Sequence, residues 1–116
     1  MDIEFLRKYC LKKKEVSEST PFDQDTLVFK VAGKMFCLFS ISTFEFVNLK
    51  CDPEEAEEMR AAYLGIEPGY HMSKAHWNSV RLNSDVTDEH LLSMVDKSYA
   101  LIVASFSKKK RLEKGL

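Results

Sequence analysis

Three short β-rich segments, separated by turns of only a few residues, constrain this chain more than any other feature. Residues 26–32, 34–41 and 44–51 are rich in β-branched and aromatic side chains. Gly33 marks the first turn and Ser42–Thr43 the second. A parallel crossover needs a dozen or more residues, so the three segments can pair only as an antiparallel meander.

The second turn sets the expected register of the last two segments. If Ser42–Thr43 is a two-residue hairpin turn, Leu38 faces Val47 and Phe36 faces Leu49, and these four form one apolar face. The other face then shows seven side chains: Met35, Cys37, Phe39, Phe44, Phe46, Asn48 and Lys50. A helix can cover one of the two faces. The other needs a helix, more sheet or a partner chain.

Helix signals lie on both sides of the meander. Residues 2–14 carry apolar side chains at helical spacing after a capping aspartate. Asp52 and Pro53 are a strong start signal for a second helix, which runs to about residue 63. Thr87 precedes a third amphipathic helix, and the basic run 108–111 is expected at its C-terminal end.

One further strand is predicted over residues 77–82, where Trp77, Ser79 and Arg81 alternate with Asn78, Val80 and Leu82. The order is then helix, three strands, helix, strand, helix. This order predicts an α+β fold of two layers, with helices packed on an antiparallel sheet. The length of 116 residues predicts one domain over residues 1–116, with residues 108–116 as a basic, frayed tail.

Composition excludes some classes of function. The net charge of -1 gives the chain no global field that attracts nucleic acid or membrane, so any such binding must come from local patches. Three scattered cysteines read as free thiols in a reducing compartment. No apolar run approaches the length of a membrane span, and the first residues do not read as a signal peptide. We expect a cytoplasmic protein without a membrane partner.

An ordered set of short motifs runs through almost the whole chain. They lie at residues 21–22, 26–31, 34–36, 48–54, 69–72, 74, 76–78 and 98–99. With this spacing the chain resembles the MmcQ/YjbR family of small bacterial proteins. The resemblance implies a YjbR-like α+β fold, similar in architecture to secretion-chaperone-like domains. It also implies DNA binding through a double-wing arrangement of β-hairpins.

The candidate nucleic-acid-binding residues are basic or aromatic side chains on strands and turns. They are Lys30, Lys34, Lys50, Tyr70, Lys74, His76 and Trp77. If the lysines converge, they form a positive stripe that can displace counterions from a phosphate backbone, and the aromatic rings can stack on bases. The alternative is that the lysines are separately solvated and that Tyr70 and Trp77 cover the edge of the core.

The residues give no sign of an enzyme. There is no glycine-rich phosphate loop, nucleotide fingerprint or paired-carboxylate motif, so we expect no catalytic residue and no cofactor. His71 and His76 are five residues apart, which suits neither one helix face nor one strand face, so no metal site is expected. Cys37 and Cys51 have apolar neighbours, which raise a thiol pKa and disfavour nucleophilic use.

Two neighbouring polar residues in the third helix have expected structural roles. Ser98 lies on the apolar stripe and is expected to bond back to the preceding turn. The Tyr99 hydroxyl is expected to reach the segment 70–77.

Two other functions remain open on the sequence alone. One is a protein-interaction or dimerising module, based on the apolar sheet face that carries Phe39, Phe44 and Phe46. The other is a small-ligand pocket lined by Tyr70, His71, Trp77 and Tyr99.

Overall fold

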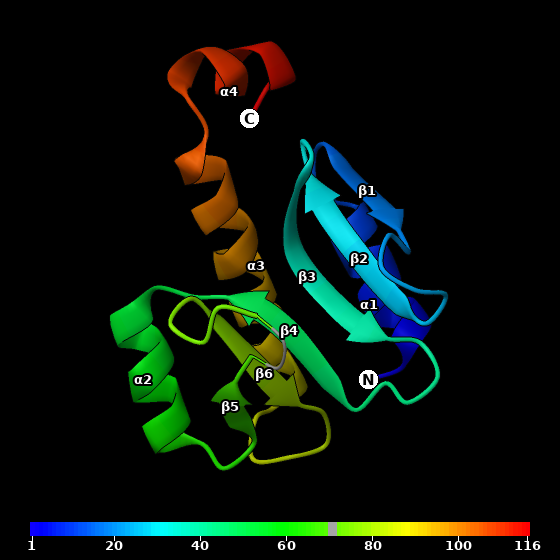
Figure 1. Cartoon of the computed structure of the whole chain (residues 1–116), viewed down its shortest axis with the longest axis vertical. Helices are drawn as coiled ribbons and strands as arrows, with labels where there is room; N and C mark the ends of the chain where they lie inside the picture. The colour runs from blue at the N-terminus through cyan, green and yellow to red at the C-terminus, as the bar shows by residue number, and fades with distance from the viewer. Residues whose placement is uncertain (70–71) are drawn as a thin grey trace.

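The computed structural model describes residues 1–69 and 72–116, which form helices packed on one sheet (Figure 1). The elements in chain order are α1 (Ile3–Leu11), β1 (Val16–Ser19), β2 (Thr26–Val31), β3 (Lys34–Ser40), β4 (Phe46–Lys50), α2 (Pro53–Ala62), β5 (Ile66–Pro68), β6 (Trp77–Arg81), α3 (Asp88–Ser105) and α4 (Lys108–Lys114). The sheet order is β1-β2-β3-β4-β6-β5, and every neighbouring pair is antiparallel. The predicted α+β fold of helices on an antiparallel sheet is confirmed.

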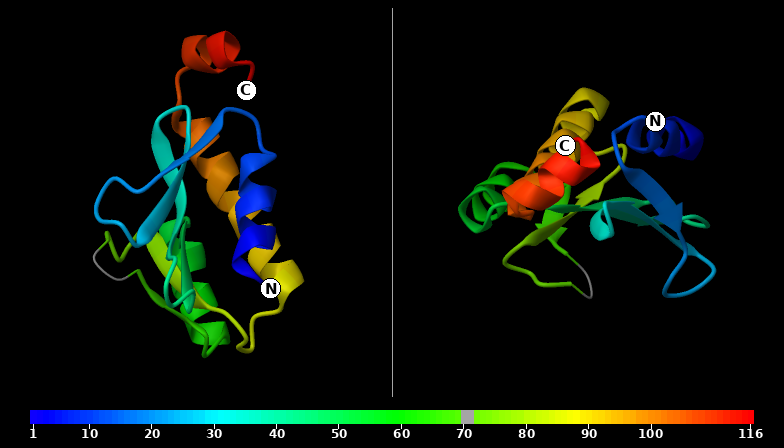
Figure 2. Two further views of the ribbon diagram at one scale, coloured as in Figure 1. Left: turned by 90° about the vertical axis from the view of Figure 1, so that its right-hand side faces the viewer. Right: turned by 90° about the horizontal axis from the view of Figure 1, so that it is seen from above.

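The helices lie on one side of the sheet. The right-hand view of Figure 2 shows α1, α3 and α4 above the strands and the β1–β2 connection below them. We call the covered side the helix face and the other side the open face. The predicted alternation in β6 is confirmed, because Asn78 and Val80 share the helix face with Leu49 and Val47 while Trp77 and Ser79 lie on the open face.

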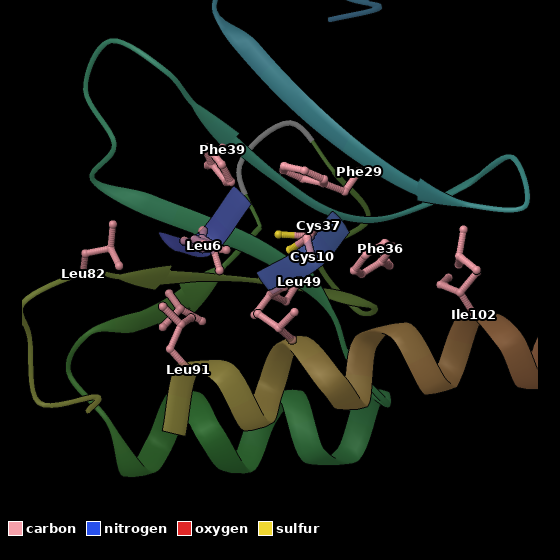
Figure 3. Close-up of a cluster of buried hydrophobic side chains, with 14 of the residues drawn as sticks. Leu6, Cys10, Phe29, Phe36, Cys37, Phe39, Leu49, Leu82, Leu91 and Ile102 are labelled. Carbon is pink, nitrogen blue, oxygen red and sulfur yellow. The ribbon is translucent and has the colours of Figure 1, made fainter. Parts of the chain in front are cut away.

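The main core lies between the helix face and helices α1 and α3 (Figure 3). Leu6 and Cys10 of α1 are fully buried, and the predicted apolar stripe of α3 supplies its four buried residues. Phe29, Cys37 and Leu49 meet them from three successive strands. Because side chains alternate along a regular strand, the residues between the core positions lie on the open face. β3 is irregular, since the successive residues Phe36 and Cys37 both enter the core.

The predicted register between β3 and β4 is wrong by one residue. The connection covers residues 41–45 instead of two residues, and Phe44 within it has a φ of 41°. Phe39 therefore pairs with Val47, and Leu38 pairs with Asn48. A shift of one residue exchanges the faces. Phe39 and Phe44 consequently pack in or against the main core, whereas Phe46 is half-buried on the open face. The three phenylalanines predicted as one dimer surface therefore do not share a face.

Three elements were not predicted. β1 is a four-residue polar edge strand and β5 has three residues, so neither carries a hydrophobic period that sequence patterns reveal. The basic run predicted at a frayed helix C-terminus instead begins the separate helix α4, which starts after the Ser107 cap. The Ser107 hydroxyl accepts the Lys110 N–H at 3.1 Å.

Ser98 and Tyr99 both have partners other than those expected. The Ser98 hydroxyl does not bond to its own helix. It donates to the Phe36 carbonyl at 2.6 Å and accepts the Lys50 N–H at 2.9 Å. The Tyr99 hydroxyl donates to the Lys14 carbonyl at 2.6 Å.

The Ser98 contact lies where two strands separate. Phe36 is an extra residue in β3, because the β2–β3 register passes from Cys37 directly to Met35. The β3–β4 pairing ends at Cys37 and Leu49, and the Ser98 hydroxyl bridges the strands one step beyond this pair. A helix side chain thus completes the sheet and fixes the strand end that carries Lys50.

Asp85 joins the start of β5 to the loop before α3. Its carboxylate accepts the Gly65 N–H at 2.8 Å and the Leu64 N–H at 2.7 Å. These bonds, the one from the Gly65 N–H foremost, hold the pKa of the Asp85 carboxyl below its ordinary value. A carboxylate with a lowered folded-state pKa stabilises the fold above its unfolded-state pKa, and this contribution is lost as pH falls through the folded-state pKa.

We therefore expect Asp85→Asn to be less stable than the wild type at pH 7 and to lose less stability on acidification. Urea unfolding midpoints of both proteins, measured from pH 7 to below about pH 4, check this, since that is where aspartate titrates. The gap between the two midpoints should narrow as the pH falls. A gap that stays constant with pH would show that the Asp85 charge contributes nothing.

Candidate nucleic-acid interface on the open sheet face

Two of the predicted lysines lie on the open face at the same end of the sheet. Lys30 pairs with Met35 across β2 and β3, and Lys50 pairs with Trp77 across β4 and β6. The residues next to them in the strands, such as Val31 and Leu49, enter the main core. Because side chains alternate along a strand, both lysine side chains point to the open face. β3 lies between their strands, and β3 and β4 separate beyond the Cys37–Leu49 pair. We call Lys30, Met35, Lys50 and Trp77 the lysine row.

Lys34 does not join the lysine row. Its ammonium group lies 3.5 Å from the Ser105 hydroxyl and 5.3 Å from the centroid of the Phe106 ring, at the C-terminal end of α3. The two-residue turn at Ala32 and Gly33 reverses the chain between Lys30 and Lys34, so these lysines project to opposite faces of one hairpin.

Lys74 and His76 are exposed in the segment that leads into β6. Arg60 of α2 fastens this segment, because its guanidinium donates to the Lys74 carbonyl and to the Trp77 carbonyl at 3.3 Å. The Arg60 Nε also donates to the Asn78 side chain at 2.7 Å. The His76 carbonyl accepts the Cys51 N–H at 2.8 Å. The backbone is held while both side chains point to solvent.

Trp77 is only 7% exposed and forms part of a second hydrophobic cluster. Its partners on the open face are Val28 and Leu38, with Met35 and Met72 packed against them. The Trp77 carbonyl accepts the Gly69 N–H at 2.8 Å, which holds the two arms of the β5–β6 connection together. This ring is a structural part of the open face, and its buried surface is not available for stacking.

Tyr70 and His71 lie outside the described residues. A ligand pocket was predicted from these two residues together with Trp77 and Tyr99. The positions of Trp77 and Tyr99 contradict it. Tyr99 belongs to α3 and meets Phe36 in the core at a centroid distance of 5.4 Å, whereas Trp77 is on the open face. The sheet therefore separates the two rings.

A hollow of about 520 Å³ lies on the open face beside the lysine row. Its lining includes Phe22 and Asp23 from the β1–β2 connection, Met35, Leu38 and Asn48 from the strands, and Met72 before β6. Phe22 is 64% exposed. The sequence motifs contain Phe22, but only the fold shows that it stands over strands that are distant in the chain. The volume is in the range of ligand-binding hollows.

Arg81 is a further basic residue that sequence reasoning left out of the site. Its guanidinium lies 4.3 Å from the centroid of the Phe46 ring and 3.6 Å from the Glu45 carboxylate. The predicted alternation of residues 77–82 put Arg81 on the same side as Trp77, so the sequence already indicated that Arg81 shares a face with the candidate residues. Its pairing with Glu45 reduces the net charge at that end of the open face.

Carboxylates make the open face electrically asymmetric. The Asp25 side chain accepts hydrogen bonds from the Ser40 hydroxyl and from the Ser42 N–H and hydroxyl, and these lower the pKa of its carboxyl. Bonds from the Thr26 and Asp25 N–H groups likewise lower the pKa of Asp23. Both carboxyls favour the ionised form, and both lie at the end of β2 opposite Lys30, where Asp23 lines the far rim of the hollow. An anionic ligand is therefore favoured at the lysine end.

The thiols are poorly suited to nucleophilic chemistry. Burial raises the pKa of the Cys37 thiol well above its ordinary value. Burial, followed by the Glu55 and Asp52 carboxylates, also raises the pKa of Cys51. Within residues 1–69 and 72–116, no three His, Cys, Asp or Glu side chains gather as a metal site. In the same residues no helix is long and apolar enough to cross a bilayer.

Comparison with known proteins gives a consistent match. A family model described as YjbR matches residues 11–101. The uncharacterized protein YbdF of Escherichia coli O157:H7 is 34% identical over 115 residues, covering 97% of this chain and 94% of that protein. The uncharacterized protein YjbR of Escherichia coli K12 is 31% identical over 112 residues, covering 96% and 95%.

Solved structures agree with the fold. The crystal structure of Deinococcus radiodurans protein DR2400, a DUF419 domain, superposes with a TM-score of 0.93 at 39% identity. The match covers 98% of this chain and 88% of that one. A Pseudomonas syringae crystal structure matches with a TM-score of 0.72 at 27% identity, covering 87% and 98%.

Proposed function

This chain belongs to the YjbR family, and on that premise we propose that it is a non-enzymatic module that binds DNA on its open sheet face. The observation that carries the proposal is the lysine row, which places Lys30 and Lys50 on one side of the sheet, two strands apart. Exposed Lys74 and His76 extend the same end of the face. DNA binding is also the activity that the sequence resemblance implies.

The hollow beside the row favours a particular form of DNA. Bases of a duplex are stacked inside the helix, whereas bases of a single strand can turn toward a protein surface and stack on exposed rings. Phe22 is the exposed ring here, and Met35 and Leu38 form an apolar floor next to Lys30. We therefore expect single-stranded DNA to bind this face more tightly than duplex DNA of the same sequence.

We further propose a reducing, cytoplasmic setting for this activity. The three cysteines are free thiols, and Cys10 and Cys37 are buried in the core.

The test is a fluorescence-anisotropy titration of labelled single- and double-stranded DNA between about 50 and 200 mM salt. Lys30→Gln/Lys50→Gln should bind more weakly than the wild type. The slope of log K against log salt should become shallower by about 1.4 on single-stranded DNA and about 1.8 on duplex DNA, since each phosphate contact contributes roughly 0.7 and 0.9 respectively. Removing two long surface side chains leaves the core intact, so circular dichroism should be unchanged.

Lys8→Gln/Lys97→Gln is a matched control, because it removes the same charge from exposed positions on α1 and α3. This control should keep the wild-type slope. If both double variants lost the same DNA affinity, the loss would come from net charge alone, and the open face would be rejected as the binding surface. No binding by the wild type at low salt would end the proposal of DNA binding altogether.

A further inference from the structure

A second basic surface, separate from the lysine row, lies at the end of the molecule where α4 meets the β2–β3 turn (Figure 1). We call it the basic pole and define it by Lys14, Lys34, Lys108, Lys109, Lys110, Arg111 and Lys114. Two acidic residues are sequence neighbours of the pole: Glu15 follows Lys14, and Glu113 precedes Lys114. A chain with a net charge of -1 thus concentrates positive charge at one end.

Contacts between distant parts of the chain assemble the pole. The Lys110 ammonium donates to the Ala32 carbonyl in the β2–β3 turn at 3.1 Å. Lys110 and Lys34 lie over the same Phe106 ring, at 4.2 Å and 5.3 Å from its centroid. At the other end of α4, Gly115 approaches the Lys14 side chain so closely that an added Cβ would lie 2.9 Å from its Nζ.

The charges of the pole are not neutralised within the protein. In the part of the chain that the structure describes, none of the seven side chains forms an ion pair with a carboxylate. Lys13, one residue before the pole, contrasts with them because it pairs with Asp96 at 2.5 Å. Uncompensated like charges repel each other, and a bound polyanion removes that repulsion.

The charge order of α4 runs against the helix dipole. Negative side chains stabilise helix N-termini, and α1, α2 and α3 all have acidic residues in their first turn. The first turn of α4 has none and carries Lys108, Lys109 and Lys110 instead. These lysines make the helix less stable. Such locally unfavourable residues are expected at surfaces that bind a ligand.

The shape of the pole fits a phosphate backbone better than a lipid surface. A helix that binds membranes needs a broad apolar face beside its basic one. The residues of α4 include one apolar side chain, Leu112, which is 72% exposed. Lys30 lies two residues before Ala32, so the lysine row begins about 7 Å from the turn that Lys110 touches.

We propose that the basic pole holds the phosphate backbone of a nucleic acid strand after the strand leaves the open face and passes over the β2–β3 turn. This inference rests on the proposed function for the identity of the ligand, but it assigns a different surface and different residues. The bases of this part of the strand are not read, so the contact is independent of sequence.

The experiment compares Lys108→Gln/Lys109→Gln with the wild type, the open-face variant Lys30→Gln/Lys50→Gln and the control Lys8→Gln/Lys97→Gln. Lys108 and Lys109 are exposed, and within the described residues neither side chain forms an ion pair, so we expect α4 to remain folded when they are replaced. Each protein is titrated with the same labelled single strand over a range of salt, using one short strand and one long strand. Vesicles with and without phosphatidylserine serve as the second anionic probe.

We expect the pole variant to lose about 1.4 units of the salt slope on the long strand and less on a strand too short to reach from the open face, since each single-strand phosphate contact contributes roughly 0.7. If the slope is unchanged in the pole variant but reduced in the open-face variant, the basic pole does not bind DNA, and the proposed function of the open face is supported. The reverse pattern would support the pole and reject the open face. Binding to phosphatidylserine vesicles but to neither DNA would show that the pole recognises lipid and overturn the inference.

Discussion

Ser98→Ala is expected to lower the free energy of unfolding by about 2–4 kcal/mol, because it leaves two buried backbone groups without partners. The Ser98 side chain is fully buried. Its hydroxyl joins the Lys50 N–H to the Phe36 carbonyl by one hydrogen bond to each. Alanine fills nearly the same volume, so the loss comes from hydrogen bonding and not from a cavity. Urea unfolding followed by circular dichroism measures it.

Ser93→Ala provides a matched control on the same helix. Ser93 is exposed and lies outside the buried stripe of α3, so this change should alter stability by less than about 0.5 kcal/mol. Ser98→Thr keeps the hydroxyl and adds a methyl group to a filled site, which separates hydrogen bonding from packing. Equal stability of Ser98→Ala and Ser93→Ala would mean that water or strand rearrangement satisfies the two groups.

Local signals explain the parts of the fold that the sequence predicted. The Asp52 cap with Pro53 and the Thr87 cap each determine a helix start from neighbouring residues, and the structure has caps at both positions. The alternation of residues 77–81 likewise depends on one strand alone. These features were predictable because each is decided within one turn or one strand.

Features that depend on distant partners were not predictable. The β3–β4 register depends on Phe44 adopting a positive φ, which a β-branched and aromatic composition does not indicate. The Ser98 bridge exists only because Phe36 bulges out of β3 next to α3. Lys34 and Lys110 belong to the basic pole only because Phe106 lies between them. Residue type alone therefore suggested the candidate residues, whereas the placement of Lys30 and Lys34 on two different surfaces depends on the fold.

Trp77→Ala is expected to destabilise the protein by about 3 kcal/mol, near the lower end of the range for buried tryptophan because the ring lies at the edge of its cluster. Trp77 covers Val28 and Leu38 on the open face and is 7% exposed. Its removal opens a cavity there, while the backbone bonds from Arg60 still hold the segment that carries Lys74 and His76. Trp77→Phe keeps most of the buried area and should cost less than half as much.

The comparison with Phe22→Ala distinguishes a structural ring from a binding ring. Phe22 is 64% exposed, so its removal should change stability by less than about 0.5 kcal/mol. If Phe22 stacks on a base, the same change should weaken single-strand binding by roughly 1–3 kcal/mol, or about fivefold to more than a hundredfold. Trp77→Phe, still folded, should bind nearly as well as the wild type. A loss of affinity in Trp77→Phe but not in Phe22→Ala would reverse the two roles and place the bound base over the second cluster instead of at the rim of the hollow.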